Sequence, residues 1–170
     1  MTHRLLLLGI AAIAVTIVVA LVVHGTDDYA LIAAASEGNL IEVKELAASG
    51  ANINASAFDD RKTPLIAASL YGHLDVVEFL ADAGADLNKA DGAGTAMYWA
   101  AFSGHPEIFD FLAGRGARLE CDEESLSRLL NRLSDQKLDQ LKSRVIAQVT
   151  IEKGEPGCTP NPIYNSDLGK

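Results

Sequence analysis

The feature that most constrains this chain is a glycine spacing that occurs three times. Gly38, Gly72 and Gly104 are each followed twelve residues later by a Gly-Ala pair, and the steps between them are 34 and 32 residues. A period of this length is typical of repeat proteins, in which each unit buries its apolar faces against its neighbours. Paired small residues precede each of these glycines and would let neighbouring helices approach closely: Ala34-Ala35, Ala68-Ser69 and Ala100-Ala101. The sequence therefore predicts an all-α stack of repeated helix pairs.

The middle unit, residues 63–88, carries the most complete set of local signals. Thr63 can cap a helix with its hydroxyl group, and Pro64 suits the first helical position, where no N–H donor is needed. Gly72 permits the positive φ that ends this helix, and Gly84 stops a second apolar helix. The unit is predicted to be a helical hairpin that needs a neighbour on each side.

On these residues the chain resembles the ankyrin-repeat family, whose unit comprises a β-turn, two antiparallel helices and a connecting hairpin. The outer units are less typical, because Tyr29-Ala30-Leu31 and Thr95-Ala96-Met97 stand where Thr-Pro-Leu is expected. The resemblance implies repeats over about 27–58, 59–91 and 92–121. The motifs that carry it are Thr63-Pro64-Leu65, Gly72-His73, Asp75-Val76-Val77 and Gly84-Ala85-Asp86-Leu87-Asn88.

A further helical pair is predicted after the third repeat. Three acidic residues at 122–124 suit a helix N-terminus, and leucines follow at i, i+3, i+4 and i+7. Ser134 or Asp135 can cap a second helix. Because the pair lacks the glycine and alanine markers, we interpret residues 122–150 as a degenerate repeat that closes the domain 27–150; a dimerisation helix is the alternative. The expected polar outer face is Arg128, Arg132, Gln136, Lys137 and Lys142.

The C-terminal residues 151–170 are rich in glycine, proline and asparagine, which favour turns or a flexible tail. Cys158 lies within this tail, and Cys121 follows the third repeat. In an oxidising compartment the two cysteines could form a disulfide that holds the tail against the repeats. The alternative is two thiols that never pair.

The N-terminal residues 1–26 form a separate segment. Residues 5–23 contain no charge over nineteen positions, and a helix of that length, at about 1.5 Å per residue, matches a hydrocarbon core of about 30 Å. Arg4 precedes the run and two aspartates follow it, so the positive-inside rule places the repeats across the membrane. We expect an inner-membrane anchor with the repeat domain in the periplasm. The alternative is a signal peptide cut near Gly25, which leaves a soluble periplasmic domain.

Beyond this leader, 13 lysines and arginines stand against 23 aspartates and glutamates, a net charge of −10. Such a balance repels phosphate backbones and argues against nucleic acid and anionic lipid surfaces as ligands. It favours a basic partner if the partner uses charge complementarity. Otherwise the acidity serves solubility alone.

The resemblance implies that the hairpin tips and the inner face of the first helices form the binding surface. The linker from Asn54 to Thr63 is one residue longer than usual and that from Asn88 to Thr95 one residue shorter, so the tips should project differently. Aromatic side chains could anchor a partner there, or they could stack between repeats. The nominated residues are Phe58, Asp59, Asp60, Arg61 and Lys62 on one tip, Asp91, Gly92 and Ala93 on the next, and Leu70, Tyr71, Tyr98, Phe102 and Ser103 on the helices.

Signals for catalysis and for metal or cofactor binding are absent from the sequence. None of the four histidines has a cysteine, glutamate or second histidine at the short spacing of a metal site. There is no Gly-x-Ser-x-Gly motif and no phosphate loop. His73 and His105 occupy the same place after Gly72 and Gly104, which indicates a role in the repeat turns. We therefore expect no enzymatic activity, metal or cofactor.

The leading hypothesis is a non-catalytic module that binds another protein outside the cytoplasm through a preformed surface, so that little conformational entropy is lost on binding. Exported bacterial ankyrin proteins that the chain resembles include some associated with protection against oxidants and some encoded as immunity partners of secreted toxins. The alternative is a structural subunit of a membrane complex, tethered through the N-terminal helix. An enzyme is the third hypothesis, for which no catalytic constellation is visible.

Overall fold

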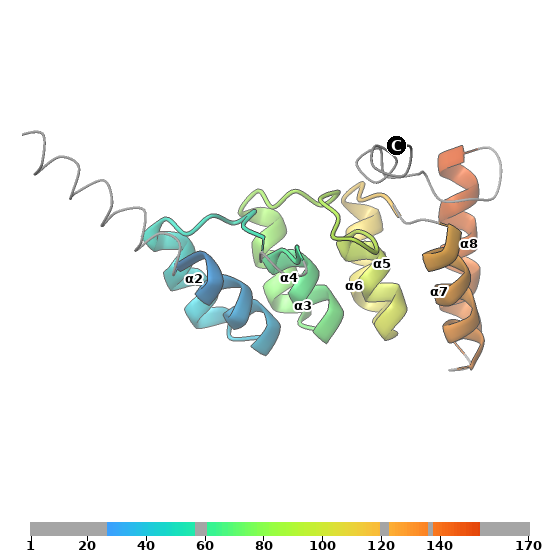
Figure 1. Ribbon diagram of the computed structural model, residues 1–170, viewed down its shortest axis with the longest axis horizontal. Coiled ribbons are helices and arrows are strands. Elements are labelled where there is room, and N and C mark those ends of the chain that lie inside the picture. Colours follow the sequence, from blue (N-terminus) through green and yellow to red (C-terminus); the bar gives the residue numbers. More distant parts are fainter. Residues whose placement is uncertain (1–26, 57–60, 120–122, 136–137, 154–170) are drawn as a thin grey trace, which may run out of the picture.

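Helix pairs standing side by side in one row make up the described part of the chain (Figure 1). The computed structural model describes residues 27–56, 61–119, 123–135 and 138–153. The predicted all-α fold of stacked helix pairs is confirmed. The helices are a helical segment over 27–37, α2 (Leu40–Ser49), α3 (Pro64–Tyr71), α4 (Leu74–Asp82), α5 (Ala96–Ser103), α6 (Pro106–Gly114), α7 (Glu123–Asp135) and α8 (Asp139–Lys153).

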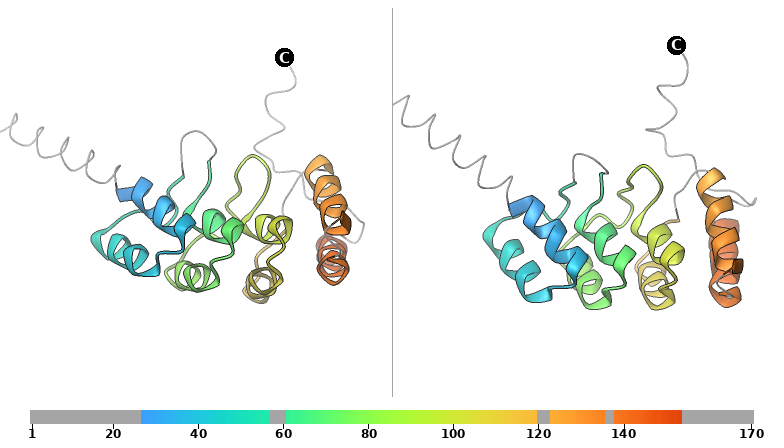
Figure 2. Two further views of the ribbon diagram at one scale, coloured as in Figure 1. Left: turned by 90° about the horizontal axis from the view of Figure 1, so that it is seen from below. Right: turned by 60° about the horizontal axis from the view of Figure 1, so that its bottom comes forward.

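The first helices of successive pairs pack on one another, and so do the second helices. Helix α3 contacts α5 and α5 contacts α7, while α2 contacts α4 and α4 contacts α6. The segments that connect one pair to the next extend from the same side of the row, beside the first helices (Figure 2). Each unit therefore adds a layer, with the tips and first helices on one face and the second helices on the other. We call these the front face and the back face.

The predicted helix ends of the middle unit are confirmed. The Thr63 hydroxyl accepts a hydrogen bond from the Ile66 N–H at 3.2 Å, and Pro64 is the first residue of α3. Gly72 ends that helix with a φ of 85°. In the third unit Thr95 makes no capping bond, and its hydroxyl instead donates to the Arg118 carbonyl at 2.9 Å. The same residue type therefore caps a helix in one unit and links two connecting segments in the next.

Histidine rings join neighbouring units at the turns between helices, as their shared place in the repeat indicated. The His73 ring lies against Gly38 of the preceding unit so closely that a Cβ at Gly38 would collide with it. Its Nε2 is 3.0 Å from the carbonyl oxygen of Ser36. His105 lies against Gly72 in the same way. These two glycines are thus required both for a positive φ and for the close approach of a ring.

The paired small residues lie at the seam between first helices, and all six are buried. Their size permits the close packing of α3 on α5. Ser69 is the one member with a polar side chain. Its hydroxyl group is buried and makes no hydrogen bond to any described residue.

The first and last units differ from the middle one where the stack ends. Asn39 caps the start of α2: its side-chain oxygen accepts from the Glu42 N–H at 3.3 Å, and its side-chain amide donates to the Glu42 carboxylate at 2.8 Å. Glu42 is exposed, whereas Val76 at the corresponding place in the middle unit is fully buried. At the other end α7 continues through Asp135, so the prediction that Ser134 or Asp135 starts the next helix was wrong.

Of the leucines at the expected spacing, Leu129 and Leu133 are buried and Leu126 and Leu130 are partly buried. Helix α8 extends to Lys153, three residues past the expected end of the cap. Among the described residues, none of the helices is both long and apolar enough to cross a membrane. The predicted anchor at 5–23 and the predicted tail after 153 lie outside the described residues.

Candidate protein-binding surface

Helices α3 and α5 form the base of the front face, and neither carries a charged residue. Tyr71, the last residue of α3, is 58% exposed. Leu70, Phe102 and Ser103 are partly buried on the same two helices. An exposed tyrosine beside partly exposed apolar side chains can contact a partner, because it offers a large rigid surface with a polar end.

Tyr98 does not share this exposure. It is only 2% exposed and its ring stacks on that of Phe102, with the centroids 5.8 Å apart. The structure therefore places Tyr98 in the hydrophobic core, where its ring stacks on a ring of the same helix. A partner that lies on the front face does not reach this side chain.

Trp99 was not among the nominated residues, yet it connects α5 to the second tip. Its indole N–H donates to the Asp91 carboxylate at 2.8 Å, which fixes the ring between α5 and the second tip. Its ring meets those of Tyr98 and Phe102 edge to face. The ammonium group of Lys62 lies 5.6 Å from its centroid. The sequence offered one signal for this residue: Trp99 is the single tryptophan of the chain, and tryptophan is enriched in binding surfaces.

Asp91 is buried, and its hydrogen bonds fix the conformation of the second tip. It is 6% exposed, and besides the indole N–H its carboxylate accepts the N–H groups of Ala93 and Gly94 at 2.8 and 3.0 Å. The backbone N–H of Asp91 also donates to the Gly94 carbonyl. These bonds close the shorter of the two linkers. The carboxylate is therefore occupied within the chain, although Asp91 was nominated for contact with a partner.

Phe102 is covered by an arginine from the last pair of helices. The Arg132 guanidinium lies 4.4 Å from the Phe102 centroid, and its Nε donates to the Phe102 carbonyl at 2.7 Å. Arg132 is exposed, as expected of a residue on an outer polar face, and its side chain also contacts α5. Lys62, Trp99, Phe102 and Arg132 thus form a continuous line in which a cation covers each end. We call these four residues the cation–aromatic row.

The first tip is described in part. Arg61 is exposed, and its φ of 57° lies in the left-handed region that favours glycine. Phe58, Asp59 and Asp60 lie outside the described residues. Cys121 and Cys158 do so as well, so their pairing stays a prediction.

Hydrogen bonds from asparagine and aspartate side chains connect the successive tips. The Asn54 side chain accepts from the Asp86 N–H at 2.8 Å, and the Asn88 side chain accepts from the Arg118 N–H at 2.8 Å. Within the first unit, Asp28 of the helical segment accepts from the Asn52 N–H at 2.7 Å. The tips are therefore held in register along the row.

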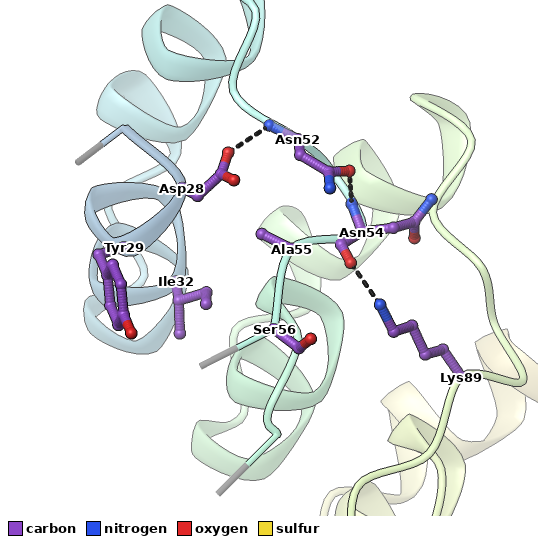
Figure 3. A pocket seen from close by; sticks show the side chains of 8 residues that line it. All are labelled: Asp28, Tyr29, Ile32, Asn52, Asn54, Ala55, Ser56 and Lys89. Atoms are coloured by element: carbon purple, nitrogen blue, oxygen red, sulfur yellow. Dashed lines mark hydrogen bonds between the residues drawn. The ribbon is translucent and has the colours of Figure 1, made fainter. Parts of the chain in front are cut away.

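A hollow of about 230 Å³ lies between the N-terminal helical segment and the first tip, beside the hydrogen bond of Asp28 with Asn52 (Figure 3). Tyr29 and Ile32 line one wall from the helical segment, and Ala55 and Ser56 line the other from the first tip. Lys89 reaches into the same region and donates to the Asn54 carbonyl at 2.6 Å. The hollow extends the front face to the first unit, and its charged groups are already bonded within the chain.

Charge is divided between the two faces. The charged residues of α4 and α6 are all acidic: Asp75, Glu78, Asp82, Glu107 and Asp110. Two of them are paired, since Asp82 bonds Arg115 at 2.8 Å and Asp110 bonds Arg144 at 2.7 Å. The back-face helices α4 and α6 thus carry acidic residues and no basic ones. In the described parts of the chain, no three histidine, cysteine, aspartate or glutamate side chains meet in a way that could hold a metal ion.

Comparison with known families agrees with this architecture. The family model described as ankyrin repeats (3 copies) matches residues 8–91. The match covers the first two units and ends before the third, so the third is identified by its glycine spacing and by its helix pair. No curated protein matches the chain.

Proposed function

We propose that this chain, which is an ankyrin-repeat protein, binds another protein through the front face of its stack. Ankyrin repeats are typically non-catalytic binding modules. The proposal names the surface: the first tip, Tyr71 at the end of α3, and the cation–aromatic row. Tyr98 and Asp91 support this surface from within.

The observation that carries the proposal is the pairing of an exposed aromatic group with a fixed one. Tyr71 is exposed at the end of an uncharged helix, and Trp99 on the next first helix is held by Asp91 and covered by Lys62. A surface whose rings are already fixed loses little conformational entropy when a partner docks. The connected tips add to this rigidity, because hydrogen bonds join the connecting segments of successive units.

We propose further that residues 5–23 place this module outside the cytoplasm, either on an uncleaved inner-membrane anchor or after cleavage near Gly25. The support is the uncharged run and the arginine that precedes it. Labelling of the repeat domain with a membrane-impermeant reagent in intact cells tests the side of the membrane. Protection of the domain until the cells are lysed would contradict this location.

Site-specific crosslinking tests the binding surface. A photoreactive residue at Tyr71 should capture a partner in the native membrane, whereas the same residue at Ile41 should not. Ile41 is a matched control because it is 73% exposed but lies on α2, in the back face. Equal capture at both positions, or at neither, would contradict binding through the front face.

The alternative function is assembly of a membrane complex through the N-terminal segment, with the repeats as a support. The apolar run at 5–23 is the observation that favours it. A chain without residues 1–26 separates the two functions. Retention of the partner by the shortened chain supports the binding module, and its loss supports assembly through the leader.

A further inference from the structure

We infer that the edge of the stack that carries the hairpin tips faces the membrane, and that the partner is an integral membrane protein bound at a segment close to the membrane surface. This inference rests on the proposed function and on its uncleaved anchor, and it names the kind of partner that the front face meets. It follows from the place where the leader joins the stack.

The row of helix pairs has two different edges (Figure 1). At one edge the first helix of each unit begins and the second helix ends, so the connecting segments with the tips lie there. At the other edge the two helices of a unit are joined by short turns at Gly38, Gly72 and Gly104. We call these the tip edge and the turn edge.

The leader joins the stack at the tip edge. The described part of the first helix begins at Asp27. The next residue, Asp28, accepts a hydrogen bond at 2.7 Å from the N–H of Asn52, in the first connecting segment (Figure 3). Asn54 of the same segment is bonded to Asp86 of the following one. The entry point of the leader is therefore fixed to the first connecting segment, and through it to the next.

The covalent connection between the uncharged run and the stack is short. Three residues, 24–26, separate the run from Asp27, and the peptide steps from residue 23 to Asp27 span at most about 14 Å. The headgroup layer itself is about 5 to 8 Å deep. With residues 5–23 across the membrane, the tip edge of the first unit therefore lies at the headgroups or just above them. The turn edge is separated from it by the helical segment 27–37, which is about 16 Å long.

An exposed tyrosine lies beside this connection. Tyr29 is 47% exposed, whereas Thr63 and Thr95, at the same place in the later units, are 2% and 0% exposed. Tyrosine is enriched at membrane–water interfaces, because its ring suits the headgroup region while its hydroxyl group stays hydrated. The repeat thus departs from its pattern toward an interfacial side chain where the leader enters.

The position of the tips limits which proteins the front face meets. Lys62 lies at the first tip and Trp99 is bonded to the second, so the cation–aromatic row begins at the tip edge. A segment of an integral membrane protein that lies at this height is confined to the same surface, which raises its effective concentration. A protein free in solution would have to reach the tips past the bilayer.

Two positions on one helix test the orientation. Ala48 and Ile41 are both exposed on α2, on one helix face and about 10 Å apart along the axis, with Ala48 toward the tip edge. Each is changed to cysteine in a full-length chain that carries Cys121→Ser and Cys158→Ser, labelled with a fluorophore, and reconstituted in vesicles whose lipids carry a quencher on the headgroup.

We expect quenching at Ala48→Cys to exceed quenching at Ile41→Cys about twofold or more, because Ala48 lies nearer the headgroups. Equal quenching, or stronger quenching at Ile41→Cys, would overturn the orientation. The mass of the chain from cells gives a separate result. A mature chain without residues 1–26 would overturn the inference and leave binding by the front face standing.

A pair of spacers tests the kind of partner. A helical spacer of about 20 residues between Thr26 and Asp27 raises the stack by about 30 Å, whereas a glycine-serine spacer of the same length lets it return to the surface. Capture by the photoreactive residue at Tyr71 should fall about tenfold or more with the helical spacer and persist with the flexible one.

The outcomes of the spacer experiment separate this inference from the proposed function. Equal capture with the two spacers would overturn the inference, since a partner free in solution is reached at either height. Identification of the captured protein as one without a membrane segment would do the same and would leave the binding function standing. Failure of the chain without a spacer to capture any protein would overturn both.

Discussion

The indole N–H of Trp99 and the carboxylate of Asp91 are joined by a hydrogen bond of 2.8 Å between the α5 helix and the tip that precedes it. The same carboxylate accepts two backbone N–H groups of that tip. One buried side chain therefore sets both the shape of the tip and the orientation of the aromatic ring on the front face. Asp91 supports the front face from within, and the following predictions separate such support from contact with a partner.

Asp91→Ala is expected to destabilise the domain by about 3 kcal/mol, because it leaves three donors without an acceptor. Denaturation by urea, followed by circular dichroism, measures the change. Trp99 emission should also shift to longer wavelength as the ring loosens. Asp86→Ala is the control, since Asp86 is exposed and, among the described residues, its carboxylate accepts one hydrogen bond, from the Asn88 N–H, so the loss should be near 1 kcal/mol.

Gly38→Ala and Gly50→Ala separate backbone strain from the contact between units. Both glycines have a positive φ, 73° and 99°, so each alanine should cost about 1 kcal/mol in strain. A Cβ at Gly38 also collides with the His73 ring, whereas a Cβ at Gly50 meets nothing within 4 Å. We expect Gly38→Ala to lose about 1 to 3 kcal/mol more than Gly50→Ala. Equal midpoints of thermal unfolding would show that the ring moves aside freely.

Ser69→Ala is expected to stabilise the stack by about 1 kcal/mol. The buried hydroxyl makes no bond to the described residues, and alanine occupies the same place in the first and third units. Differential scanning calorimetry should show a higher unfolding temperature. Ser103→Ala, at a partly exposed position of α5, should leave it nearly unchanged. A lower unfolding temperature for Ser69→Ala would mean that the hydroxyl has a partner in solution.

Tyr98→Ala and Tyr71→Ala should have opposite effects on stability and on binding. Loss of the buried ring of Tyr98 should cost about 3 to 5 kcal/mol in the free energy of unfolding. Loss of the exposed ring of Tyr71 should change that free energy by less than about 0.5 kcal/mol. Tyr71→Ala should instead weaken capture of the partner about tenfold, measured by titration of the purified pair. Full affinity in Tyr71→Ala would remove this residue from the contact surface.

The helix pairs and their ends could be predicted from the sequence because the signals are local. Thr63 and Pro64 start a helix, and Gly72 ends it, through bonds and dihedral angles that involve only neighbouring residues. The repeat period then extends this prediction along the chain. The small residues before each glycine were correctly placed in the seam between helices, since only small side chains permit that approach.

The front face was harder to predict from the same residues. Helix α5 has no charged residue, so periodicity alone does not show which of its aromatic side chains faces outward. Tyr98 and Phe102 were nominated and Trp99 was not, although Trp99 stands at the centre of the row. Asp91 was nominated for contact with a partner because the family resemblance makes the hairpin tips a binding surface, but its bonds to the tip bury it.

The amino-acid sequence is sufficient for the architecture of this protein, because a repeated unit is specified by short-range signals that each copy carries. The character of its front face depends on contacts between units that are distant in the sequence. Lys62 meets Trp99 and Phe102 meets Arg132 only because stacking brings a tip, a first helix and the last helix pair into one line. The same stacking places the acids of α4 and α6 on the opposite face. A chain with a net negative charge therefore still has a row with a cation at each end.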